Sequence, residues 1–182
     1  LHGKFSLTTN YTGTVALDVP DTVKFLNPIE TSSPKLDKPI DFSKPMVFRW
    51  KPIPGVLGFH AYIIGMKGKN LLITWSSAEV RTDYGINFDF MQMADVIDNV
   101  KKTVFMAPEC TEVIVPAGIF TDCDFVHMVM VGYGTGAALG EGQPLPRCQT
   151  KTTLTLMLGG KEMEKQMGGF GDFDMGGEDD GE

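Results

Sequence analysis

Short apolar segments separated by proline and glycine are the feature that most constrains the fold of this chain. Apolar residues gather at 46–50, 59–66 and 71–77, and "KPIPG" at 51–55 supplies a turn between the first two segments. In the first segment Met46, Phe48 and Trp50 occupy alternate positions, as in a strand with one buried face. Strands do not alternate with helices along the chain, so a parallel sheet is not expected. The pattern predicts an all-β protein with antiparallel sheets.

One segment departs from this pattern and predicts a single inserted helix at about 88–102. Apolar residues recur there at helical spacing, at Phe90, Met93, Ala94, Ile97 and Val100. A stripe of this kind most often buries itself against a sheet. We therefore expect an amphipathic helix that covers a sheet edge or an opening between two sheets.

The segment "DFVHMVMVGY" (124–133) is apolar at positions that fall on both faces of a strand. A strand with one solvated face alternates, so this composition indicates that both faces are covered. The inserted helix or a second subunit would supply the second cover. Met128 and Met130 suit an adaptable contact surface, and we predict that they take part in interactions.

Two segments resemble a known family of modules. "MVFRWKPIPGVLGFHAYI" (46–63) is similar to the second and third strands of fibronectin type III-like modules, with Trp50 as the core tryptophan. "VIVPAGIFTDCDFVHMVMVGYG" (113–134) is similar to the corner between the fifth and sixth strands in bacterial members of that superfamily. Phe125 stands where those modules usually carry a corner tyrosine.

The resemblance implies an antiparallel two-sheet fibronectin type III-like, or immunoglobulin-like, sandwich over residues 1–159. Within it we expect N-terminal strands at 1–30, a proline-rich connection at 31–45 and the module core at 46–158, followed by a tail at 160–182. Aligning Phe125 with the corner position turns Phe125 and His127 inward. The core residues expected on this basis are Met46, Phe48, Trp50, Phe59, Ala61, Ile63, Val113, Val115, Phe125 and Val129.

The same implied strand order bears on the three cysteines. It brings Cys110 and Cys148 to one end of the sandwich and leaves Cys123 at the other end. Any disulfide is therefore expected to join Cys110 to Cys148, which would support an extracellular setting. Because the chain begins with Leu1, we also expect a processed N-terminus and a secreted or cell-surface location.

The sequence carries no complete enzyme signature, and we predict a protein that is not an enzyme and binds no cofactor. "GYGTGA" (132–137) meets the loose form of a dinucleotide-binding loop, but "ALGEGQPLPRC" after it cannot form the required helix. Metal ligands are offered by His60 and His127 on neighbouring strands and by Asp172 and Asp174 in the tail. Neither pair has an evident third ligand, so we expect no metal site.

The charge of the chain is concentrated in its tail. The formal net charge is −7, and residues 160–182 hold eight acidic residues and two lysines, which leaves the rest of the chain at −1. A nearly neutral body without a basic cluster excludes nucleic acid as an expected partner, and no apolar run is long enough for a transmembrane segment. In the tail, Phe170, Phe173 and Met175 offer apolar anchors for contact with another chain.

Three functions remain after these observations. We expect a non-enzymatic, secreted or cell-surface structural module that contacts a protein partner or assembles into an oligomer or filament through its tail or its terminal strands. The alternative is a ligand-binding module of carbohydrate type, with exposed aromatic residues such as Tyr62, Tyr84 and Tyr133. The second alternative is a metal-binding protein that uses the acidic, methionine-containing tail.

Overall fold

The computed structural model describes residues 2–11, 13–37, 40–80, 91–138 and 147–160. The tail from residue 161 onward, with the predicted contact residues Phe170, Phe173 and Met175 and the acidic pair Asp172 and Asp174, lies outside the described residues. In chain order the elements are β1 (Gly3–Thr9), β2 (Gly13–Val19), β3 (Thr31–Ser33), β4 (Met46–Trp50), β5 (Val56–Lys67), β6 (Leu71–Ser76), α1 (Met93–Lys101), β7 (Glu112–Val115), β8 (Phe125–Ala138) and β9 (Arg147–Gly159).

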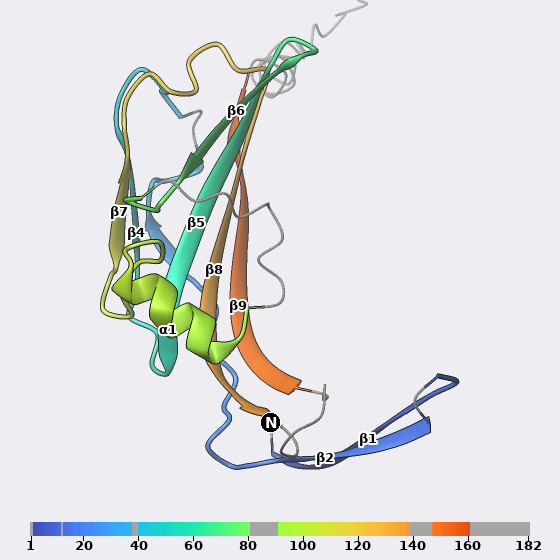
Figure 1. The fold of residues 1–182 in the computed structure, drawn as a ribbon. Helices are drawn as coiled ribbons and strands as arrows, with labels where there is room; N and C mark the ends of the chain where they lie inside the picture. The colour runs from blue at the N-terminus through green and yellow to red at the C-terminus, as the bar shows by residue number, and fades with distance from the viewer. Residues whose placement is uncertain (1, 12, 38–39, 81–90, 139–146, 161–182) are drawn as a thin grey trace, which may run out of the picture.

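The strands form antiparallel sheets, which confirms the predicted all-β class. β1 pairs with β2, a three-stranded sheet has the order β3-β4-β7, and a four-stranded sheet has the order β6-β5-β8-β9. Figure 1 shows β4 and β7 lying on one side of the molecule and the long strands β5, β8 and β9 beside them. The β1–β2 hairpin projects away from both larger sheets.

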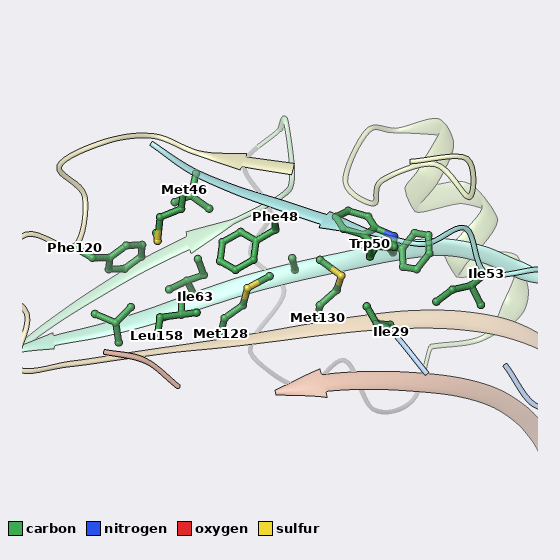
Figure 2. Packing of buried hydrophobic residues seen from close by; sticks show 14 of the residues in the cluster. Ile29, Met46, Phe48, Trp50, Ile53, Ile63, Phe120, Met128, Met130 and Leu158 are labelled. Atoms are coloured by element: carbon green, nitrogen blue, oxygen red, sulfur yellow. The ribbon is translucent and has the colours of Figure 1, made fainter. Parts of the chain in front are cut away.

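The main core draws its side chains from both larger sheets (Figure 2). Trp50 on β4 meets Phe59 on β5 edge to face, with ring centroids 5.5 Å apart. Predicted core residues that are buried in this cluster are Met46, Phe48, Trp50, Phe59, Ala61, Ile63 and Val115. Val113 is partly buried and packs against them.

The prediction was wrong about which face of β8 points into this core. Val126, Met128 and Met130 are fully buried there, whereas Phe125, His127 and Val129 lie on the opposite face and are partly exposed. Side chains alternate along a strand, so an alignment error of one residue moves the whole set to the other face. The corner alignment made this error by placing Phe125 inward. Because Met128 and Met130 are internal, neither is available for the contacts predicted for them.

The helix covers part of the outer face of the four-stranded sheet, whereas the sequence predicted a helix over a sheet edge or over an opening between two sheets. It spans Met93–Lys101, and the remainder of the predicted range that precedes residue 91 lies outside the described residues. Its buried face is rotated from the predicted stripe, because Val96 and Asn99 are buried while Met93 and Ile97 are exposed. Together with the turn that follows it, the helix forms a second cluster of Val96, Val104, Phe105, Val131 and Tyr133.

Candidate interaction site

The N-terminal hairpin has one apolar face, which we call the hairpin face. Phe5 lies directly opposite Leu17, and Leu7 lies directly opposite Val15. Directly opposed residues in an antiparallel pair share a face, so these four side chains form one surface. Leu7 is 59% exposed and Phe5 39% exposed, so the hairpin face is largely open to solvent.

The opposite face of the same hairpin is polar. Lys4 pairs with Asp18, Ser6 with Ala16, and Thr8 with Thr14. The two threonine hydroxyl groups share a hydrogen bond of 2.9 Å across the strands. The hairpin is therefore amphipathic, with a polar side suited to water and an apolar side suited to another surface.

The hairpin leaves Phe5 and Leu7 of its apolar side exposed, whereas Val15 and Leu17 are partly buried. β1 and β2 pack on each other and make at most marginal contact with the other strands and with α1. The base is fixed, because Val19 at the end of β2 and Val23 beyond it are both buried. A two-stranded hairpin is marginally stable in water unless its apolar face packs against something. The hairpin is thus a projecting two-stranded ribbon with exposed apolar side chains, a shape suited to contact with another surface.

A second apolar surface lies on the outer face of the four-stranded sheet, beyond the part that α1 covers. We call this surface the outer patch, and it comprises Ile64, Met66, Leu72, Phe125, His127 and Met157. Strand pairing holds these residues in two rows, since Leu72 pairs with Met66, Met66 with Phe125, Ile64 with His127, and His127 with Met157. Alternation puts all of them on the face opposite Met128 and Met130.

The outer patch is open to solvent in the described part of the chain. Leu72 is 55% exposed, Met157 46% and Met66 42%. Contiguous exposed apolar groups on a folded domain usually mark a site of contact with another molecule. We expected both faces of β8 to be covered, but α1 covers the outer face of β8 over only part of the strand.

The two histidines on neighbouring strands do not form a metal site. His60 pairs with Val131 and His127 pairs with Ile64, so the two imidazoles lie four residues apart along the ladder, or about 13 Å. Burial beneath Phe105 lowers the pKa of His60 to about 4, although a backbone hydrogen bond with Val104 opposes this shift. Across the residues that the structure describes, no three His, Cys, Asp or Glu side chains gather as a metal site requires.

The aromatic residues expected to bind carbohydrate are not gathered on the surface. Tyr133 is buried and stacks on Phe105, with ring centroids 5.3 Å apart. Tyr62 is partly buried against the same cluster, and Tyr84 lies outside the described residues. The exposed aromatic groove of the ligand-binding alternative is absent from the described part of the chain.

All three cysteines are free thiols, so the expected bridge between Cys110 and Cys148 is not formed in this structure. The Cys110 thiol donates to the Glu112 carbonyl at the start of β7. Cys148 on β9 lines a pocket of about 230 Å³ beside the first turn of α1. Cys110 thus lies two residues before β7 of the three-stranded sheet, whereas Cys148 lies on β9 of the four-stranded sheet. The pocket residues are Gln92, Met93, Ala94, Gly136, Ala137, Cys148 and Gln149.

The sequence carried a signal for the hairpin that we did not use. In "KFSLTT" and "TVALDV", apolar and polar residues alternate on both sides of a Gly-containing turn, which is a hairpin pattern. The pattern does not show that, in the described residues, these two strands pair with each other and with no other strand.

Comparisons with family models, curated proteins and solved structures find no match to this chain. In the portion of the chain that the structure describes, no helix is both long and apolar enough to span a membrane.

Proposed function

We propose that this protein is a non-enzymatic structural module that associates with further copies of itself through its N-terminal hairpin. The observation that carries the proposal is the hairpin face, whose Phe5 and Leu7 are exposed on an arm that projects from the body. Strands that present an apolar face and open edges are a common route to association between chains.

We also propose that the body is a fibronectin type III-like sandwich. Counted from β3, one sheet contains the first, second and fifth strands, and the other contains the third, fourth, sixth and seventh. The first, second and fifth strands share one sheet and the third, sixth and seventh share the other, as in immunoglobulin-like modules, whereas the fourth strand, β6, pairs with the third. Trp50 lies in the core between the sheets. Modules of this architecture serve as scaffolds in many settings, which favours a structural role over catalysis. A secreted or cell-surface location is part of the same proposal, and the resemblance supports it.

Sedimentation velocity over a hundredfold range of concentration tests the proposal. The full chain is expected to shift from monomer to a larger species as concentration rises. A variant with Phe5→Ser and Leu7→Ser removes two large side chains from the hairpin face and is expected to stay monomeric. The matched control exchanges a directly opposed pair on the polar face, Ser6→Ala with Ala16→Ser, and is expected to associate as the original chain does.

Two results would contradict the proposal. One is a full chain that remains monomeric at every concentration. The other is a variant of the hairpin face that associates as strongly as the control. Deleting residues 161–182 tests the separate prediction that the tail supplies contacts, because the proposal requires association to survive this deletion.

A further inference from the structure

We infer that the hairpin face of one copy packs on the outer patch of a second copy, and that the second copy returns the same contact. This inference rests on the proposed function and names the surface that receives the hairpin. Both partners in the contact are apolar sheet faces, and such faces pack at about 10 Å with interdigitating side chains. The juxtaposed groups are Phe5 and Leu7 on the hairpin with Met66, Leu72 and Met157 on the patch.

The occupant of the outer patch is a second copy because the hairpin of the same chain points elsewhere. Buried Val19 and Val23 fix the base of the hairpin, and from this base the two strands extend away from the four-stranded sheet (Figure 1). In the part of the chain that the structure describes, there are therefore two exposed apolar surfaces that do not meet within one molecule. In a pair of molecules, the hairpin face of one can cover the outer patch of the other.

The area of the hairpin face indicates that the contact is reciprocal. Seven residues at about 3.3 Å each make a strand pair roughly 23 Å long and, with its side chains, on the order of 10 Å wide. Its footprint is about 230 Å² on each partner, or about 460 Å² when both partners are counted, whereas stable interfaces bury about 1,200–2,000 Å². Two contacts related by a two-fold axis double this area to about 920 Å², which is typical of a weak and reversible dimer, and they close the assembly.

Direct packing between two hairpin faces is the competing arrangement, and the same estimate argues against it. It would cover one strip of roughly 460 Å² in total and would leave Leu72, Met66 and Met157 exposed on both copies. Reciprocal docking covers both surfaces on both copies, so it removes more apolar area from water.

Arginine substitutions in the outer patch test this inference. Met66→Arg with Met157→Arg places two charges on the patch, at positions already open to solvent, so the fold is expected to be kept. The dimer Kd is expected to rise by at least about tenfold for each contact that is weakened. Ile114→Arg is the matched control, because Ile114 is an exposed apolar residue on β7 of the other sheet, and its Kd is expected to be unchanged.

A mixing experiment distinguishes reciprocal docking from the alternatives. The hairpin variant, Phe5→Ser with Leu7→Ser, retains an intact patch, and the patch variant, Met66→Arg with Met157→Arg, retains an intact hairpin. Each alone is expected to be monomeric, whereas an equal mixture forms one intact contact per pair. Sedimentation of the mixture is therefore expected to show association about tenfold or more tighter than either variant alone, and weaker than the original chain.

The outcomes separate this inference from the proposed function. If the patch variant associates like the original chain while the hairpin variant does not, the docking surface is wrong and hairpin-mediated association stands. If both variants are monomeric and the mixture is monomeric as well, reciprocal docking is overturned. If the original chain never associates, the proposed function and this inference fail together. Matching circular dichroism spectra and melting temperatures confirm that each variant is folded.

Discussion

The β1–β2 hairpin and the β8–β9 pair are both antiparallel ladders, but they differ in what lies against their faces. The inner face of β8 packs in the main core, and part of its outer face lies under α1. The hairpin pairs over seven residues on each strand without either cover in the described structure. Strand pairing is therefore similar in both regions, whereas burial differs. We expect burial to decide where the stability of the molecule resides.

The largest expected effect comes from emptying the core that covers β8. Trp50 packs against Phe59, and Trp50→Ala is expected to lower the free energy of unfolding by about 3–5 kcal/mol through cavity formation. The indole N–H of Trp50 is buried with no hydrogen-bond partner in the described structure, so Trp50→Phe removes an unsatisfied donor and is expected to cost much less. Urea unfolding measures both values, and similar losses for the two variants would contradict this account.

The pH dependence of stability tests the packing of the residues that lie beneath α1. Burial lowers the pKa of His60 to about 4, whereas the unfolded chain has the ordinary value of 6.5. Between these values the unfolded state binds a proton that the folded state does not, so stability falls as the pH drops from 6.5 to 4. The total loss from this group is about 3 kcal/mol.

Urea unfolding at several values between pH 7.5 and pH 4.5 checks this prediction. The variant His60→Gln keeps a polar group at this position and cannot titrate, so its stability is expected to vary less across the same range. Equal losses in the original chain and the variant would show that other groups cause the pH dependence.

A smaller effect is expected where the core leaves no room for a methyl group. A Cβ atom at Gly65 would lie 2.6 Å from Phe120 Cδ1 and 2.9 Å from Cys123 Sγ. Gly65→Ala is therefore expected to cost about 1–3 kcal/mol through overpacking. Thr74→Ala, at an exposed position on the neighbouring strand β6, is the comparison and is expected to change stability by less than about 0.5 kcal/mol. A Gly65→Ala loss no larger than that of Thr74→Ala would show that the core adjusts freely.

The smallest effect on stability is expected in the hairpin. Phe5→Ser with Leu7→Ser alters exposed side chains on a hairpin that makes at most marginal contact with the other strands and with α1, so the unfolding free energy of the dilute monomer is expected to change by less than about 0.5 kcal/mol. Thermal unfolding below the association range measures this directly. A large drop in melting temperature would show that the hairpin belongs to the core of the body, contrary to the comparison above.

The sequence predicted elements better than it predicted faces. Alternation at Met46, Phe48 and Trp50 identified the buried face of β4, because between these positions Arg49 is polar and exposed and Val47 is only partly buried. β8 is apolar on both faces, so its composition does not show which face is buried. The alignment with the corner position placed Phe125 and Val129 inward, which is wrong. In α1, the apolar stripe included Ile97, yet the sheet receives Val96 and Asn99 instead.

The two exposed apolar surfaces, the hairpin face and the outer patch, were harder to predict than the buried faces for a related reason. Alternation shows that a strand has an apolar face, but it does not show whether another element covers that face. Phe5 and Leu72 sit in ordinary strand patterns, and their exposure is decided by the distant segments that pack elsewhere. The sequence predicted assembly through the tail or the terminal strands, which stays a prediction, and it did not show that β1 and β2 pair only with each other in the described residues.

The short strand β3 gives the molecule a mechanical property. The hairpin joins the body through residues 20–30, with Ile29 buried in the main core and β3 held by two backbone pairs, Thr31 with Trp50 and Ser33 with Arg49. Tension applied through the hairpins of an assembly would reach this connection first, and its few backbone hydrogen bonds would break one after another. Single-molecule pulling on the N-terminus is expected to show an early low-force step as Ile29 and β3 detach. The longer β8–β9 ladder would yield afterwards, so the assembly would stretch before its modules unfold.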